Sequence, residues 1–190
     1  MAPRVVHLHI GSTKTGTTFI QRVLWSNKKA LKANGVVLPA KGQYVFGRAA
    51  RALHHWQPAE DPVPSDWMQV ARSINRSRSD AAIVSQEFLS WLDPEQVKAM
   101  VATIENAQVK VVLTTRDLAR LIPAQWQSAM RQRNTWTLTE YSHGVQHGSE
   151  QDPKRSPYQH FWHRMDYAAT LRAWSDVVGL ENVTVGAGRR

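Results

Sequence analysis

The residues best suited to chemistry lie near the start of the chain, in the segment HIGSTKTGTTFIQ at 9–21. Gly11 and Gly16 enclose a lysine, Lys14, together with several hydroxyl side chains. An apolar run precedes this turn and an amphipathic segment follows it, so the turn joins a predicted strand to a predicted helix. Backbone N–H groups in such a turn, and the positive end of the helix behind it, can hold a phosphate. The segment therefore predicts an anion-binding loop.

The position of the lysine separates this loop from an ATP-binding loop. The glycine spacing matches G-x-x-x-x-G, but an ATP-binding loop carries its lysine directly after the second glycine. Thr17 occupies that place here, and Lys14 comes two residues before Gly16. The ammonium group must therefore point at a different part of the bound anion.

The segment STKTGTT at 12–18 resembles the 5′-phosphosulfate loop of sulfotransferases that use 3′-phosphoadenosine-5′-phosphosulfate (PAPS), whose pattern is K-[ST]-G-T-T. The resemblance implies that Lys14 is catalytic and neutralises charge that grows on the departing phosphate oxygen. It implies no metal, because the lysine and the helix end supply the positive charge. The loop residues implied to bind PAPS are Ser12, Thr13, Lys14, Thr15, Gly16, Thr17 and Thr18.

A second segment, LTTRDLARLIPAQWQ at 113–127, resembles the part of these enzymes in which an arginine after a strand binds the 3′-phosphate of PAPS. Arg116 is that arginine, and a guanidinium can meet a phosphate with two hydrogen bonds. The family commonly places a serine eight residues later, where this chain has Ala124. We take Gln125 as the replacement ligand, with Gln127 and Ser128 as alternatives. The segment FWHRMDYAATLRAW at 161–174 resembles a late helix of bacterial relatives.

Sulfuryl transfer to an alcohol needs a base for the proton of the acceptor. Many members of the family use a histidine and others a glutamate. Glu87 is our candidate, because it follows the predicted central strand at 81–85 and should face Lys14 across the cleft. A helix-capping or surface carboxylate is the competing interpretation. The alternative bases are His9, His54 and His55, and Ser85 is a further candidate ligand.

The order of elements predicts a three-layer α/β fold with a central parallel sheet flanked by helices, as one sulfotransferase-like domain over 1–190. In such sheets ligands bind beyond the carboxyl ends of the strands. Relatives continue past the strand at 182–185, so we expect a shortened domain. We expect strands at 4–10, 36–39, 81–85, 109–115 and 182–185, helices at 17–34, 47–56, 66–78, 93–106, 117–133 and 161–178, and a loop at 142–157.

Details within these helices can be predicted as well. Asp93 and Asp117 should cap helix starts, and Pro123 should kink the helix at 117–133 or mark its true start. Asn34-Gly35 should end the first helix. One buried face of that helix should carry Phe19, Ile20, Val23, Leu24 and Leu31.

The composition restricts the partners. The chain of 190 residues has a formal net charge of +9 and no cysteine, so anionic partners are favoured and thiolate chemistry is excluded. No segment approaches the roughly 20 apolar residues of a membrane span. We expect a cytoplasmic, bacterial-type transferase that acts on a small-molecule or glycan acceptor, without nucleic acid or membrane insertion.

The residues leave two other functions open. An ATP-dependent small-molecule kinase would need magnesium, and a non-catalytic polyanion-binding protein would need only the positive charge. The pair His143 and His147 has a spacing that metal sites use, but it lies in the predicted loop and lacks a third ligand.

Overall fold

The computed structural model describes residues 4–187, and its centre is a five-stranded sheet in which every recorded strand pair is parallel. The strand order is β2-β3-β1-β4-β5, which places the first strand in the middle. The predicted α/β fold with a central parallel sheet is confirmed. The strands are β1 (Arg4–His9), β2 (Val36–Val37), β3 (Ala81–Ser85), β4 (Ala107–Thr115) and β5 (Val183–Ala187).

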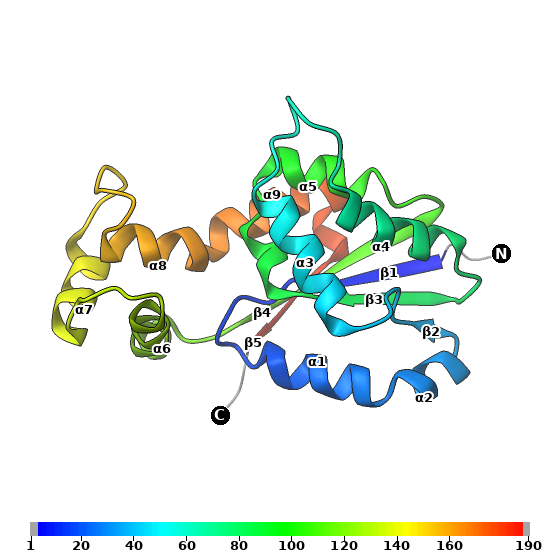
Figure 1. The fold of residues 1–190 in the computed structure, drawn as a ribbon, viewed down its shortest axis with the longest axis horizontal. Coiled ribbons are helices and arrows are strands. Elements are labelled where there is room, and N and C mark those ends of the chain that lie inside the picture. Colours follow the sequence, from blue (N-terminus) through cyan, green and yellow to red (C-terminus); the bar gives the residue numbers. More distant parts are fainter. Residues whose placement is uncertain (1–3, 188–190) are drawn as a thin grey trace.

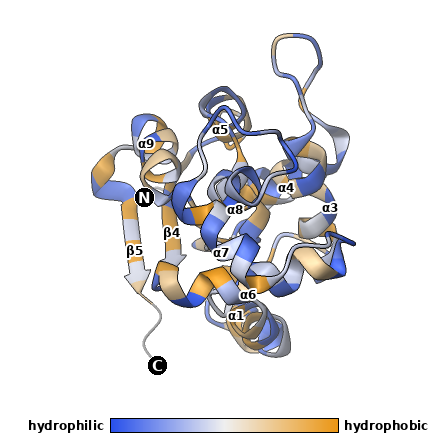
Figure 2. Ribbon diagram, turned by 90° about the vertical axis from the view of Figure 1, so that its left-hand side faces the viewer, coloured by the Kyte–Doolittle hydropathy of each residue, from blue (hydrophilic) through white to orange (hydrophobic). Residues whose placement is uncertain are grey.

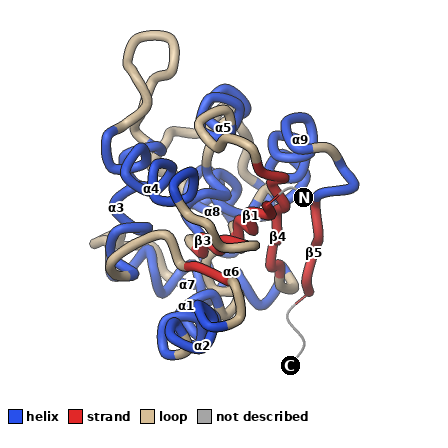
Figure 3. The backbone as a smooth tube through the Cα atoms, turned by 90° about the vertical axis from the view of Figure 1, so that its right-hand side faces the viewer, coloured by secondary structure: helices blue, strands red, loops and turns tan. Residues whose placement is uncertain are grey.

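Helices cover the sheet from two sides (Figures 1 and 3). On one side lie α1 (Thr17–Ser26) and α2 (Lys28–Ala33). On the other side lie α3 (Gln43–His54), α4 (Ser65–Arg76), α5 (Pro94–Val101) and α9 (Tyr167–Val178). Two short 3₁₀ segments, η1 (Glu87–Trp91) and η2 (Leu180–Asn182), follow β3 and α9. At the edge of the sheet β4 and β5 lie side by side (Figure 2).

The main core fills only one of the two sheet faces. In β1, Val6 and Leu8 are fully buried against the layer of α3, α4, α5 and α9, whereas Val5 and His7 on the opposite face are half-buried. Successive side chains of a strand point to opposite faces, so this alternation marks which face carries the core. The sheet is therefore anchored chiefly through one side.

The remaining helices, α6 (Leu118–Arg131), α7 (Leu138–His147) and α8 (Pro157–Met165), form a separate group beyond β4 (Figure 1). They have a small core of their own around Leu121, Tyr141, Phe161 and Met165. Because α6 follows β4 directly, this group stands next to the carboxyl ends of the strands, where the ligand site is expected.

Two of the predicted helices are each divided in the structure. The expected helix at 17–34 stops at Ser26, because Asn27 leaves the helical conformation and its side chain bonds the carbonyl of Val23. The expected helix at 161–178 is interrupted at Asp166, which caps α9 by accepting a hydrogen bond from the Ala169 amide. Both interruptions come from short polar side chains that compete for backbone groups.

The predicted loop at 142–157 was wrong in its first part, and Pro123 does not mark the true start of its helix. A kink at Pro123 stays a prediction. Helix α7 runs to His147, because Thr137 and Glu140 form a capping box at its start. Helix α6 begins at Leu118 and continues through Pro123. Its start is set by the Asp117 cap, which was predicted. The Asp93 cap of α5 is confirmed too.

The predicted apolar face of the first helix was wrong in part, because Ile20, Leu24 and Leu31 are only half-buried and the other two residues are exposed. Phe19 is 72% exposed and Val23 is 43% exposed, while Thr17 and Gln21 are the buried residues of this helix. The helix turns a polar stripe inward because Gln21 meets polar side chains of η1, which follows β3, and of α3. This reversal bears directly on the functional site.

No helix among the described residues is both long enough and apolar enough to cross a bilayer.

Candidate functional site

The loop between β1 and α1 turns through two residues with left-handed backbone. Lys14 has a φ of 67° and Gly16 a φ of 90°. Gly16 is the N-cap of α1, and no side-chain hydrogen bond caps this helix end. Its first-turn amides are therefore available to an anion, which the helix dipole also favours. The turn therefore leaves room for an anion at the start of α1, and anion binding by this loop stays a prediction.

Gly11 is required where the loop crosses the end of β4. A Cβ atom at this position would lie 1.8 Å from Oγ1 of Thr114, so no larger residue fits without displacement. The amide of Ser12 donates to the carbonyl of Thr114 over 3.1 Å, and the Thr15 and Thr114 hydroxyls are 2.9 Å apart. The loop is thus fastened to β4 on the side away from its ligand face.

Two of the predicted loop ligands use their side chains for this internal fastening. Thr15 Oγ1 donates to the carbonyl of Ser12 over 2.6 Å. The Ser12 hydroxyl is buried and lies 3.2 Å from the hydroxyl of Tyr167 in α9. Neither side chain lines the cavity described next.

A cavity of about 290 Å³ lies above the loop, beyond the ends of β1 and β3. Thr13, Lys14, Gly16, Thr17 and Thr18 line it from the loop side. Glu87, Phe88 and Trp91 of η1 line it from the other side, and its wall is completed by Gln125, Ser128, Gln132 and Arg164. Lys14 and Glu87 therefore meet in one cavity, as the sequence led us to expect. We call this the loop cavity.

Glu87 is held by a chain of amides that the sequence did not reveal. Gln21 Nε2 donates to Glu87 Oε2 over 2.6 Å, and Gln43 Nε2 donates to Gln21 Oε1 over 2.6 Å. Gln21 is only 4% exposed. The Gln43 donor fixes the orientation of the Gln21 amide, so that its NH₂ group faces the carboxylate. The one available signal was the position of Gln21 one turn after Thr17, on the same face of α1.

The histidine at the end of β1 has a structural environment. His9 is 6% exposed, with Nδ1 2.6 Å from Oγ of Ser85 and Nε2 3.2 Å from Oγ1 of Thr114. Burial lowers the pKa of His9, which favours the neutral ring. His9 and Ser85 thus tie together three strand ends and do not line the loop cavity.

The other two candidate bases lie at the carboxyl end of α3. His54 packs with its ring centroid 5.6 Å from Trp91 and 5.8 Å from His163, and His55 is exposed. Burial lowers the pKa of His54, as do the neighbouring charges. Neither histidine lines the loop cavity, so among the four candidate bases only Glu87 does so.

Helix α6 brings polar side chains to the loop, but not all from the expected position. Gln125 is 2% exposed, and its Nε2 donates to Oγ1 of Thr13 over 2.7 Å. Ser128, one turn further along, also lines the loop cavity, whereas Ala124 does not. The helix therefore presents Gln125 and Ser128 to the loop on one face.

Arg116 lies at the end of β4, outside the loop cavity. It is exposed, its Nη1 is 3.4 Å from the carbonyl of Lys14, and its amide is 3.4 Å from the hydroxyl of Tyr167. The guanidinium thus lies close to the loop. Its contact with an anion stays a prediction.

The electrostatics of the loop cavity are positive. Burial lowers the pKa of Lys14 from its usual value of 10.5, and the nearby charge of Arg131 lowers it further. Both effects disfavour the bare ammonium and are offset when an anion approaches.

Within residues 4–187, no group of three or more His, Asp or Glu side chains could hold a metal ion, and His143 and His147 belong to helix α7.

Comparison with known proteins gives a likeness of fold. No protein-family model and no curated protein matches this sequence. Among solved structures, a sulfotransferase from Alicyclobacillus acidocaldarius superposes with a TM-score of 0.56 at 17% sequence identity. The match covers 98% of this chain and 73% of that protein. The chain therefore has a sulfotransferase-like fold.

Proposed function

We propose that this protein transfers a sulfuryl group from PAPS to a hydroxyl of a small molecule or glycan. The observation that carries the proposal is the loop cavity, in which a lysine, an uncapped helix N-terminus and a carboxylate converge. These residues fit the donor, because the lysine and the helix N-terminus suit an anion and the carboxylate opposite them can act as a base. The likeness of fold supports the same reaction.

Different residues of this chain would act on the donor and on the acceptor. When bound, PAPS supplies an activated sulfuryl group. The amides at the start of α1 and the hydroxyls of Thr17 and Thr18 would hold its 5′-phosphate. The Lys14 ammonium would stabilise charge on the oxygen from which sulfur departs. Thr13, Gly16 and Gln125 would shape this end of the site, with Ser12 and Thr15 keeping the loop in place and Arg116 meeting the 3′-phosphate.

Glu87 would accept the proton of the acceptor hydroxyl as the new sulfur–oxygen bond forms. Gln21 occupies Oε2 of this carboxylate, which leaves Oε1 for the acceptor. Gln21 is thus a positioning residue: it keeps the base directed at the loop without touching either substrate.

Ligand-induced thermal stabilisation tests the proposal. Adenosine 3′,5′-bisphosphate (PAP), the product nucleotide, should raise the melting temperature in the presence of EDTA. At a hundredfold excess over the dissociation constant, binding adds about 2.7 kcal/mol. For a chain of this size each kcal/mol shifts the midpoint by roughly 2–4 °C. Lys14→Met should lose most of this shift, and Lys41→Met, at an exposed site away from the loop cavity, should keep it.

The same experiment separates the rival functions. A kinase would be stabilised by Mg·ADP and not by PAP with EDTA. A polyanion-binding protein would respond to PAP and ADP alike, and the response would vanish at high salt. Either pattern would refute the proposal.

A further inference from the structure

A second cavity of about 750 Å³ lies beside the loop cavity, between the end of α6 and helix α8. We call it the basic cavity, because its lining includes Arg133, Lys154, Arg155 and Arg164 and no aspartate or glutamate. Burial and the charge of Arg164 lower the pKa of His160 to about 4, so this histidine is neutral near pH 7. The charge of the basic cavity therefore comes from its permanent cations.

These cations are not neutralised by the protein. Within residues 4–187, the ion pair between Arg48 and Asp66 is the only one within 4.0 Å, and it lies outside both cavities. Four like charges around one cavity repel each other, and that repulsion is relieved when an anion enters. The lining thus has the composition of an anion site.

Arg164 is the most constrained of the four. Its Nη1 donates to the carbonyl of His160 over 2.5 Å, and its guanidinium lies 5.4 Å from the ring centre of Trp91. Burial lowers its pKa, which reports that the charged form is poorly solvated where it stands. A half-buried guanidinium without a carboxylate partner costs stability. Such a cost is recovered when a ligand supplies the missing anion.

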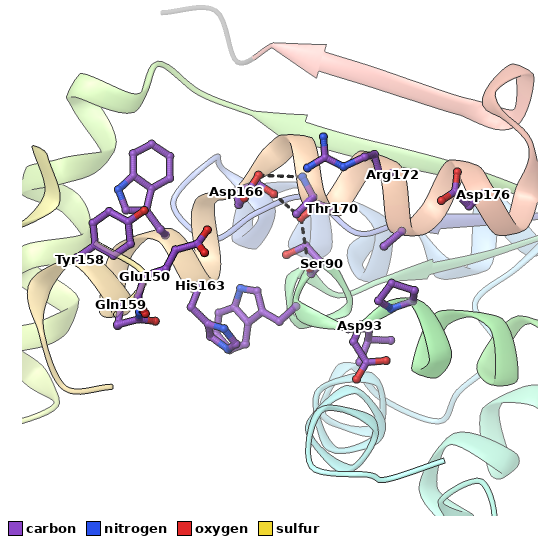
Figure 4. A pocket seen from close by; sticks show the side chains of 16 residues that line it. Ser90, Asp93, Glu150, Tyr158, Gln159, His163, Asp166, Thr170, Arg172 and Asp176 are labelled. Atoms are coloured by element: carbon purple, nitrogen blue, oxygen red, sulfur yellow. Dashed lines mark hydrogen bonds between the residues drawn. The ribbon is translucent and has the colours of Figure 1, made fainter. Parts of the chain in front are cut away.

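A neighbouring cavity provides a contrast. It measures about 730 Å³ and lies between η1, α5 and the helices α8 and α9 (Figure 4). Four carboxylates line it, from Asp93, Glu150, Asp166 and Asp176, against the single arginine Arg172. Positive charge is thus concentrated on one side of α8 and is not a general property of its surface.

The basic cavity and the loop cavity adjoin each other. Arg164 and Gln132 line both of them. Arg164 stacks on Trp91, which belongs to η1, the same segment that carries Glu87. Arg116, expected to meet the 3′-phosphate of the donor, does not line the basic cavity and contacts the carbonyl of Lys14 instead. The basic cavity thus lies beside the segment that carries Glu87, the residue to which the proposed function assigns the acceptor hydroxyl.

We propose that the basic cavity binds an acidic group of the acceptor, so that the enzyme selects hydroxyl compounds that already carry a carboxylate, sulfate or phosphate. This rests on the proposed sulfuryl transfer to an acceptor at Glu87. The acidic group would enter between α6 and α8 and hold the acceptor with one hydroxyl in the loop cavity. Neutral alcohols would lack that anchor.

Calorimetric titration of the full chain with sucrose octasulfate and with PAP, in 150 mM salt, tests this inference. The test variant is Lys154→Gln with Arg155→Gln, because both residues are exposed and line only the basic cavity. The control is Lys29→Gln with Lys98→Gln, which removes the same charge from exposed sites outside the cavities. Neutral sucrose serves as the uncharged probe.

We expect the test variant to weaken sucrose octasulfate binding at least tenfold and to change PAP binding less than twofold. The control variant should alter neither, and sucrose should not bind. Equal weakening of the probe in both variants would mean attraction by overall charge and would overturn the inference. A parallel loss of PAP binding in the test variant would assign the cavity to the donor, with the same consequence.

The two proposals can fail separately. If PAP binds but the probe does not bind at the basic cavity, the sulfuryl-transfer proposal stands and only the acceptor assignment falls. If the probe binds there but PAP does not bind at all, sulfuryl transfer is refuted, and the acceptor assignment falls with it.

Discussion

The backbone at Lys14 allows a prediction about stability that needs no knowledge of the acceptor. Lys14 has a φ of 67°, a conformation that costs a residue with a Cβ atom about 1–2 kcal/mol. Glycine avoids this cost but loses about 0.4–1 kcal/mol more backbone entropy on folding. We therefore expect Lys14→Gly to be more stable than Lys14→Ala by about 0.5–1 kcal/mol. Both variants lack the ammonium, so their difference isolates the backbone.

Urea unfolding monitored by tryptophan fluorescence measures this difference. With a denaturant slope near 2 kcal/mol/M, the midpoint of the glycine variant should lie about 0.25–0.5 M higher. Both variants should also lose most of the thermal stabilisation by PAP. Together these results would show that the loop keeps a strained lysine for its ligand and not for its stability.

A control at Lys41 should give the opposite sign. Lys41 is exposed and lies outside the residues with positive φ, so Lys41→Gly should be less stable than Lys41→Ala. The reasoning on strain is refuted if Lys14→Gly is no more stable than Lys14→Ala. The role of the ammonium is refuted if either Lys14 variant retains the full response to PAP.

Three further predictions concern the rest of the site. Gln21→Met should lower the free energy of unfolding in urea by about 2–4 kcal/mol, because it removes a neutral hydrogen bond and one to the Glu87 carboxylate. PAP affinity should stay intact, and unchanged stability would contradict the amide chain. Gly11→Ala should destabilise the fold by about 1–3 kcal/mol through its clash with Thr114, and adding Thr114→Ala should recover part of the loss; no recovery would place the strain elsewhere. Because the pKa of Lys14 is lowered, PAP affinity measured by calorimetry should be full near neutral pH and should begin to fall at a pH below the usual lysine pKa of 10.5. In Lys14→Arg, high PAP affinity should extend to higher pH. Identical pH profiles in the two proteins would rule out a role for the ammonium.

The sequence was sufficient to predict those helices and strands that depend on a few neighbouring residues. Asp93 and Asp117 cap helices through their own side chains, and β1 and β4 are apolar runs bounded by turns, so both kinds of feature are visible in a few neighbouring residues. The breaks in the helices at Asn27 and Asp166 were not predicted. A short polar side chain within an amphipathic helical pattern can either stay in the helix or bond the backbone and end it, and only the packing around it decides which.

The sequence by itself determined the turn from Gly11 to Gly16, since its residues are contiguous and the strand and helix on either side follow from local pattern. Its role in binding an anion stays a prediction. Only the tertiary structure decided what faces that loop. Gln21, Gln43 and Glu87 come from three separate elements, and α1 turns a polar stripe inward because Gln21 meets side chains of η1 and α3 there. Hydrophobic periodicity reports how apolar a helix face is, and not which neighbour it will meet, so the partners of a buried amide are fixed only when the sheet brings distant segments together.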